Sequence, residues 1–275
     1  VCSSDLGGTT KDSNKQLLHM VGYYDHKRKV VPRPTILLDK STSDPHDNPV
    51  ISVDAKGYIW IFSTSHGRMR PSYVHRSTKP YNIDTFERIA ATRIKNGRAV
   101  PLSNFSYFQV WHEKQGFIAF FTQYNNPVDR TLFSMSSRDG KSWSAWTRLA
   151  AFGKGHYQIS AARDGKVCSA FNYHPPKGGL DRRTNLYYIE SADHGRTWQT
   201  AAGRKLELPV KAIDSPALVH DFIKTKHNVY LKDIRLDAAG RPLILVVTSG
   251  GPQPTKSNDP RRWQLFRWTG KTWDL

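Results

Sequence analysis

Short apolar runs alternate with polar turns along most of the chain, and no run has the length or the 3.6-residue period of a helix. Between His46 and His66 lie an apolar run at 50–53, a polar turn at 54–57 and a second apolar run at 58–63. Two such runs around a short polar turn predict an antiparallel hairpin. If the strands pair symmetrically about the turn, the two histidines face each other where the strands emerge, with Cβ atoms about 5 Å apart.

The same plan recurs in four segments: an apolar run, a glycine turn, a second apolar run, a polar loop, and a strand that ends in a tight turn with an aromatic residue. A four-stranded unit repeated in this way is typical of a β-propeller blade. The sequence therefore predicts an all-β fold, a β-propeller of four-stranded antiparallel blades. The predicted blades span residues 44–95, 104–150, 155–205 and 212–273, and their closing aromatic residues are Phe86, Trp143, Trp198 and Trp273.

A hairpin-like segment at residues 15–37, with its turn at 25–28, precedes the first blade. It predicts part of a further blade, which gives about four and a half blades in all. Since most closed propellers need more, we expect the chain to be a fragment of a seven-bladed propeller. Residues 1–6 are expected to be an assembly artefact, because CSSDL is encoded by the end of a common sequencing adapter. Residues 7–275 are then a single partial β-propeller domain.

Two closing turns resemble the S-x-D-x-G-x-x-W turn known as an Asp-box: SADHGRTW at 191–198 and the shorter SSRDGKSW at 136–143. In such a turn the Ser hydroxyl and the Asp carboxylate accept backbone N–H groups, Gly takes a positive φ, and Trp packs beneath. The turn joins the outer strands of a blade, far from the central channel. Asp139 and Asp193 are therefore predicted to be structural and are excluded as catalytic acids.

Composition narrows the class of partner. The 275 residues include 41 Lys and Arg against 23 Asp and Glu, a formal net charge of +18, which favours an acidic partner. The basic residues are scattered and no zinc-finger or RRM signature is present, so we predict an anionic polysaccharide or oligosaccharide rather than nucleic acid. The alternative that the positive charge only forms a solvated surface and binds no partner stays open. No apolar stretch is long enough for a membrane span, and Cys2 and Cys168 offer no disulfide framework.

Polar residues occupy positions where the blades face the central channel. In a propeller the first strand of each blade lines this channel, and ligands bind where loops converge on one rim. The hairpin register places Tyr107 near Tyr124, and His156 near Tyr173. A single His or Tyr in a water-filled channel more often hydrogen bonds to a backbone carbonyl than takes part in chemistry. The set of several such residues favours a functional site. With the loops that follow the second strands, seven residues are predicted to bind substrate: Asn48, Tyr124, Arg130, His156, Tyr173, His174 and Arg183.

Histidine, tyrosine and arginine residues suit elimination by a lyase better than hydrolysis by a glycosidase. A glycoside hydrolase needs two carboxylates on either side of the scissile bond. Asp44, Asp47, Asp181 and Asp214 are candidates, but Asp44 and Asp47 lie on one short loop and cannot straddle a sugar. A lyase needs a base for the proton α to a uronate carboxyl, a donor that neutralises this carboxylate, and an acid for the leaving oxygen. Histidine, tyrosine and arginine supply all three.

Several motifs resemble those of the BNR-repeat propeller proteins, a group that includes the ulvan lyases. They are HDNP at 46–49 followed by a hairpin, the second histidine His66, SYFQ at 106–109, FNYHPP at 171–176, and the Asp-box turns. The resemblance implies a propeller enzyme that acts on rhamnose–glucuronate linkages. Some relatives bind a structural metal ion, so such an ion is compatible with the resemblance. The His and Cys spacings here predict neither a metal site nor a cofactor.

The resemblance also implies roles for single residues. By its resemblance to the ulvan lyases, His46 is expected to be the base or the partner of the base. Tyr107 is expected to be the acid or a second proton-transfer group. His66 and Arg130 resemble the residues that neutralise the uronate carboxylate, and Tyr173 resembles a sugar-subsite contact.

The leading hypothesis is an enzyme, a polysaccharide lyase that cleaves a uronic-acid-containing glycan by β-elimination, with His46, Tyr107 and His66 as catalytic residues. Two alternatives stay open: a glycoside hydrolase on the same scaffold, and a carbohydrate-binding propeller without turnover. A protein that acts on such glycans is expected to be extracellular or periplasmic, with its export signal outside this sequence.

Overall fold

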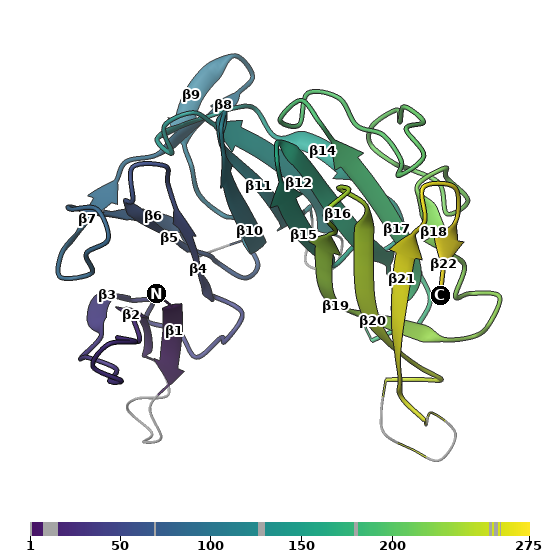
Figure 1. The fold of residues 1–275 in the computed structure, drawn as a ribbon, viewed down its shortest axis with the longest axis horizontal. Helices are drawn as coiled ribbons and strands as arrows, with labels where there is room; N and C mark the ends of the chain where they lie inside the picture. The colour runs from purple at the N-terminus through teal and green to yellow at the C-terminus, as the bar shows by residue number, and fades with distance from the viewer. Residues whose placement is uncertain are drawn as a thin grey trace. The chain divides into compact units, whose positions relative to one another are not determined.

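The computed structural model describes residues 2–7, 16–68, 70–125, 130–178, 181–252, 255, 258 and 260–275; residues 2–7 are described by their backbone. The regular elements in these ranges are β-strands, in agreement with the predicted all-β class (Figure 1). Within the same ranges no helix has the length and hydropathy that crossing a bilayer requires.

The strands are, in chain order, β1 (Cys2–Gly7), β2 (Leu17–Gly22), β3 (Thr35–Asp39), β4 (Pro49–Val53), β5 (Ile59–Ser63), β6 (Tyr73–Ser77), β7 (Phe86–Ile89), β8 (Thr92–Lys95), β9 (Arg98–Pro101), β10 (Ser106–Glu113) and β11 (Gly116–Tyr124). They continue as β12 (Arg130–Ser137), β13 (Ser142–Trp143), β14 (Thr147–Ala150), β15 (Gln158–Arg163), β16 (Lys166–Tyr173), β17 (Thr184–Ser191), β18 (Leu218–His220), β19 (Asn228–Leu236), β20 (Pro242–Ser249), β21 (Arg262–Trp268) and β22 (Trp273–Asp274).

These strands form five sheets in the described residues. Strands β4 to β7, β15 to β18 and β19 to β22 each form a four-stranded antiparallel sheet in sequence order. Strands β1 to β3 form a three-stranded sheet, which contains the hairpin predicted before the first blade. The fifth sheet has the order β10-β11-β12-β13-β8-β9, with β14 paired to β12. Four-stranded antiparallel sheets in sequence order confirm the predicted propeller blades.

The hairpin of β4 and β5 has the predicted register. Pro49 pairs with Ser63, so the strands are symmetric about the turn that was expected from the sequence. Gly57 closes this turn with a φ of 83°. This positive φ favours glycine, and a Cβ here would also lie 2.3 Å from the exposed ring of Tyr81, which would have to move aside.

Two predicted blade boundaries were wrong. The hairpin of β8 and β9 belongs to the fifth sheet rather than to the blade predicted at 44–95, because β8 pairs parallel with β13. Strand β18 lies beyond the predicted blade at 155–205, yet it pairs with β17 of that blade. Both outer strands are short, TRIK and LVH, and carry no apolar run that marks them in the sequence.

Both Asp-box turns have the predicted structure. In each, the serine hydroxyl accepts the glycine N–H at 2.9 Å. The indole N–H of Trp143 or Trp198 donates to the carbonyl of the same glycine, so the two rings hold equivalent places. Asp139 and Asp193 each accept two backbone N–H groups of the turn. These contacts account for both carboxylates, as a structural role requires.

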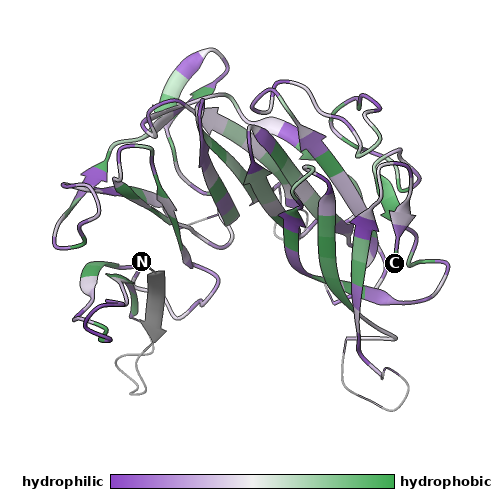
Figure 2. Ribbon diagram, in the orientation of Figure 1, coloured by the Kyte–Doolittle hydropathy of each residue, from purple (hydrophilic) through white to green (hydrophobic). Residues whose placement is uncertain are grey.

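The chain divides into two compact units, each with its own core. Unit 1 comprises Val1–Ala119 and Ser137–Ala145, and unit 2 comprises Phe120–Ser136 and Trp146–Leu275. Figure 2 shows hydrophobic residues concentrated in the strands and hydrophilic ones in the connecting loops. Cys168 lies in the core of unit 2 as a buried free thiol, as predicted, and burial raises its pKa to about 12.

Candidate active site

Two histidines face each other at the open end of the β4–β5 hairpin in unit 1. The rings of His46 and His66 stack, with centroids 4.4 Å apart and planes 25° apart, as the hairpin register predicted. The side chain of His46 is 51% exposed and that of His66 is 27% exposed. The pair is therefore accessible to a ligand from solvent.

One carboxylate bridges the two imidazoles. Asp44 Oδ1 accepts the Nδ1–H of His46 at 2.7 Å, and Asp44 Oδ2 accepts the Nδ1–H of His66 at 2.8 Å. Oδ1 also accepts the backbone N–H of His46 at 3.1 Å. Burial acts to raise the pKa of Asp44, but hydrogen bonds from His46, His66 and Arg70 outweigh it and hold the pKa well below its usual value. Asp44 is therefore ionised at neutral pH.

Arg70 joins Asp44 to a second carboxylate, Asp47. Its Nη2 donates to Asp44 Oδ2 and to Asp47 Oδ1, both at 2.7 Å, and its Nε donates to Asp47 Oδ2 at 2.8 Å. Hydrogen bonding to Asp47, above all, raises the pKa of Arg70. Asp47 is fully buried and accepts the backbone N–H of His66 at 2.6 Å. One guanidinium thus fixes His66 twice, through its ring by Asp44 and through its backbone by Asp47.

Two further buried side chains support this loop. Lys40 Nζ donates to the carbonyls of Thr64 at 2.8 Å and Pro71 at 2.6 Å, and it lies 3.4 Å from Asp47 Oδ2. Burial lowers the pKa of Lys40, although the charge of Asp47 acts to raise it. His19 of β2 donates from Nε2 to the carbonyl of Asp47 at 2.6 Å. The loop that carries the two carboxylates is therefore held by His19 of β2, by Lys40 after β3 and by Arg70 before β6.

Tyr107 completes the cluster. It lies near the start of β10 in the left-handed region, with a φ of 50°, which is uncommon for an aromatic residue. Its hydroxyl lies 3.3 Å from His66 Nε2, and its ring packs edge-on against both imidazoles. The structure thus brings together the three residues predicted to be catalytic. Asn48, predicted to bind substrate, is exposed on the same loop, and its carbonyl accepts the Thr64 hydroxyl at 2.7 Å.

In unit 2, two arginines lie against one tyrosine. The guanidinium of Arg130, which is 2% exposed, lies 4.1 Å from the ring centre of Tyr157 and 5.6 Å from that of Tyr124. The guanidinium of Arg183 lies 4.7 Å from the ring centre of Tyr157 and 5.3 Å from that of Tyr230. Aromatic faces stabilise cations at such distances, so the cluster concentrates positive charge. Three of its members were predicted to bind substrate, and Tyr157 and Tyr230 were not.

The remaining predicted residues of unit 2 are buried. His156 is fully buried, with its Nδ1 donating to the carbonyl of Asn172 at 2.8 Å and its Nε2 accepting the N–H of Phe152 at 3.4 Å. Burial lowers the pKa of His156 to about 4, against the effect of the hydrogen bond to Asn172. Tyr173 is 4% exposed and stacks on Phe152, and His174 is fully buried. Burial favours a structural role for all three residues, and their predicted contact with substrate stays a prediction.

Asp44, His46 and His66 are the one group of described residues whose donor atoms, within 4.8 Å of one another, suggest a metal site. An imidazole binds a metal along a lone pair in the plane of its ring. The two rings are nearly parallel and direct Nδ1 at different oxygens of one carboxylate. The observed rotamers therefore suit hydrogen bonds to Asp44 better than shared coordination of one ion.

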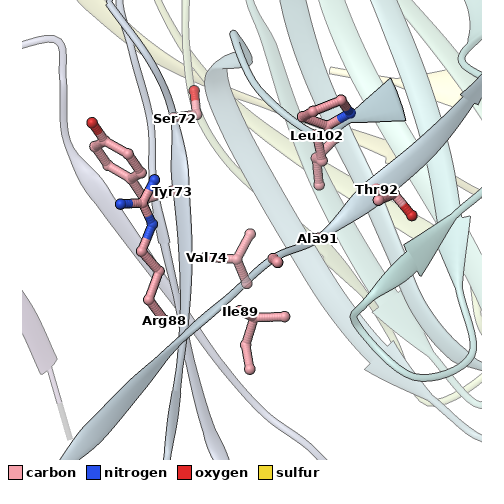
Figure 3. A pocket seen from close by; sticks show the side chains of 10 residues that line it. Ser72, Tyr73, Val74, Arg88, Ile89, Ala91, Thr92 and Leu102 are labelled. Atoms are coloured by element: carbon pink, nitrogen blue, oxygen red, sulfur yellow. The ribbon is translucent and has the colours of Figure 1, made fainter. Parts of the chain in front are cut away.

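A cavity of about 390 Å³ lies in unit 1 beside β6, β7 and β8 (Figure 3). Among the described residues that line it there is no histidine and no carboxylate. Its charged residue, Arg88, lies 4.2 Å from the ring centre of Tyr73. The cavity therefore lacks the acid–base pair that the imidazole cluster contains. Its lining consists of Ser72, Tyr73, Val74, Arg88, Ile89, Ala90, Ala91, Thr92, Pro101 and Leu102.

The sequence predicts His46, His66 and Tyr107 as site residues but not the residues that hold them in place. Asp44 was weighed only as a glycosidase carboxylate, although its place two residues before His46 signals a local hydrogen bond. Arg70 follows the hairpin and gave no signal, because its pairing with Asp47 depends on the loop conformation. The predicted convergence of the unit 1 and unit 2 residues on one rim stays a prediction.

Comparison with known proteins gives a family. Residues 17–275 match the family described as BNR repeat-containing family member. An ulvan lyase of Nonlabens ulvanivorans is 25% identical over an alignment of 268 residues that covers 85% of this chain and 54% of the relative. An ulvan lyase of Pseudoalteromonas sp. (strain PLSV) is 24% identical over an alignment of 262 residues that covers 84% of this chain and 51% of the relative. The chain thus spans about half the length of the curated relatives it matches.

A solved structure gives the fold. The structure of an ulvan lyase bound to -[GlcA(1-4)Rha3S]- matches with a TM-score of 0.75 and 18% identity, over 94% of this chain and 67% of that chain. At this identity the likeness supports the fold, in agreement with the blades described above. Because the family match covers most of the sequence, the chain belongs to the BNR repeat-containing family.

Proposed function

We propose that this chain carries the acid–base site of a polysaccharide lyase that cleaves a uronic-acid-containing glycan by β-elimination. The observation that carries the proposal is the accessible pair of His46 and His66, held by an ionised Asp44 beside the hydroxyl of Tyr107. The similarity to ulvan lyases supports the same reaction class. A relative with this fold is bound to -[GlcA(1-4)Rha3S]-, which supports an acidic glycan as substrate.

In a β-elimination, a base removes the proton α to the uronate carboxyl, the released electron pair forms a carbon–carbon double bond, and the glycosidic C–O bond breaks as an acid protonates the leaving oxygen. We assign His46 as the base, because its ring is half exposed and its Nε2 has no hydrogen-bond partner among the described residues. Tyr107 is the acid. After turnover Tyr107 is a phenolate and His46 holds the abstracted proton; loss of that proton from His46 to solvent and uptake of one proton by Tyr107 restore both groups. The restored hydroxyl lies 3.3 Å from His66 Nε2.

The uronate carboxylate must be neutralised during this reaction, because charge builds up on it as the proton leaves. The resemblance gives this role to His66 and Arg130, and it stays a prediction for both. Arg130 is 2% exposed and lies in unit 2 with Arg183, where the two guanidinium groups flank Tyr157.

The structure weakens the hydrolase alternative at this cluster. Asp47 is fully buried, and Arg70 bonds to both Asp44 and Asp47, so neither carboxylate is placed to protonate a glycosidic oxygen. Binding without turnover is the second candidate function, and the arginine–tyrosine cluster of unit 2 favours it.

Incubation of the chain with ulvan and with other uronate polysaccharides separates these functions. A lyase produces new chain ends together with the ultraviolet absorbance of an unsaturated uronate. New reducing ends without this absorbance would identify a hydrolase instead. Binding with neither product would reduce the chain to a carbohydrate-binding protein.

A further inference from the structure

The carboxylate of Asp44 contacts the same nitrogen, Nδ1, of both histidines. An ionised carboxylate only accepts hydrogen bonds, so each Nδ1 must carry a hydrogen. A neutral imidazole has one N–H group, and its second nitrogen carries a lone pair. When the rings are neutral, both Nε2 atoms therefore carry the lone pair.

We propose that Asp44 is a positioning residue that holds His46 and His66 in the Nδ1-protonated tautomer and so directs both Nε2 lone pairs away from the loop. For His66 this lone pair meets the hydroxyl of Tyr107, which then donates to it. For His46 it lies on the half-exposed ring that we assign as base. The catalytic meaning of the inference rests on the proposed function, whereas the tautomers belong to the folded chain and can be measured without substrate.

The surroundings of Asp44 fix the direction of its carboxylate. Oδ1 accepts both the ring and the backbone N–H of His46, and Oδ2 accepts His66 and Arg70. Arg70 cannot turn away without losing Asp47, to which it donates two hydrogen bonds. A rotation of the carboxylate would break the local turn at His46 or the ion pair with Arg70. Asp44 is therefore held in one orientation against both rings.

The variant Asp44→Asn should act on the two rings differently. Arg70 can only donate, so the amide oxygen is expected on the Oδ2 side, where it still accepts from His66. The amide NH₂ then faces Nδ1 of His46, which must become an acceptor, and the backbone N–H of His46 loses its acceptor, which is the smaller loss beside the charged contact with Arg70. The hydrogen of His46 moves to Nε2, and the ring loses the lone pair that a base needs. We therefore expect the tautomer to switch at His46 alone.

Nitrogen-15 NMR of the full chain with labelled histidine measures these tautomers at a pH where the rings are neutral. The two signals are assigned with His46→Gln and His66→Gln. The wild type should show Nδ1–H at both residues, and Asp44→Asn should show Nε2–H at His46. The elimination rate of Asp44→Asn should fall on the order of 10²-fold or more, because general acid–base catalysis typically contributes that much.

The matched control is Asp84→Asn, which removes an exposed carboxylate of unit 1 that bonds to Asn82. It should leave both the tautomers and the elimination rate unchanged. Nε2–H at either neutral histidine of the wild type overturns the proposal, and this measurement needs no variant to fold. An unchanged His46 tautomer in folded Asp44→Asn overturns it as well. A chain with the predicted tautomers but without elimination supports the role of Asp44 and refutes the proposed function, so the two failures are distinguishable.

Discussion

The imidazole cluster of unit 1 and the buried histidine of unit 2 show what separates a chemical site from a polar core. His46 is half exposed and hydrogen bonds to an ionised carboxylate. His156 is fully buried and uses both ring nitrogens for backbone groups. Both residues were predicted from equivalent positions of the repeat. Position in a propeller blade is therefore a weak guide to chemistry, and the partner and exposure of each ring are the stronger guides.

The arginines of the two units differ in the same way. Arg70 bonds to two carboxylates, which fixes the loop that carries His46 and His66. Arg130 and Arg183 lie against aromatic rings, which stabilise a cation without cancelling its charge. The first arrangement positions the proposed catalytic groups, and the second is the one that we propose to bind an anionic ligand.

Removal of one hydroxyl should have the largest effect. Tyr107→Phe is expected to lower the rate of elimination by about 10²- to 10⁴-fold, because it deletes the proposed acid and keeps the ring. Affinity for the glycan should change little. Tyr24→Phe is the control, since Tyr24 is 48% exposed and lies outside the cluster. Equal rates for the two variants would remove Tyr107 from the mechanism.

Buried histidines should make the fold sensitive to mild acid. The pKa of His156 is about 4 in the folded chain and near 6.5 in the unfolded chain. Between these two values the unfolded chain binds more protons, so the free energy of unfolding decreases as the pH is lowered from about 6.5 to about 4. The loss over this window approaches about 3 kcal/mol for a fully buried histidine. His75, whose pKa burial also lowers to about 4, adds to it.

Urea unfolding between neutral pH and about pH 4 measures this dependence. His156→Gln should flatten the curve, because glutamine does not titrate. His46→Gln, at the exposed ring, is the comparison. A pH dependence that survives in His156→Gln at full size would contradict the buried, neutral state of His156.

A smaller effect is expected from the second cluster. Arg183→Leu should weaken binding of an anionic glycan by about 10- to 100-fold, since one charged hydrogen bond contributes roughly 1.5–3 kcal/mol. Arg235→Leu, at an exposed arginine of β19 that pairs with Asp233, is the control. Calorimetry with a uronate oligosaccharide measures both. Equal affinities for the two variants would leave the cluster of unit 2 without a binding role.

The smallest effect is expected at an Asp-box. Asp193→Asn loses charge at a carboxylate that accepts two backbone N–H groups, and it should lower the free energy of unfolding by about 1 kcal/mol. The elimination rate should not change, in contrast to Asp44→Asn. A loss of turnover in Asp193→Asn with intact folding would contradict the purely structural role of Asp193.

Local rules predicted most of what the structure contains. The β4–β5 register and the Asp-box turns follow from the alternation of apolar residues and from turn chemistry, which act over a few residues. The stacking of His46 on His66 follows from that register. The parallel pairing of β8 with β13 and the bonds of Arg70 could not be predicted, because each joins segments far apart in the sequence. Burial of His156 was missed for the same reason.

The rate of unsaturated product formation by His46→Ala tests the central claim most directly. His46 is half exposed and precedes strand β4, so its truncation should leave the unfolding midpoint nearly unchanged. On a uronate glycan that the wild-type chain cleaves, we predict that the variant forms no unsaturated product above background. Product formation at a near wild-type rate would contradict the account and reduce the paired imidazoles to a binding surface.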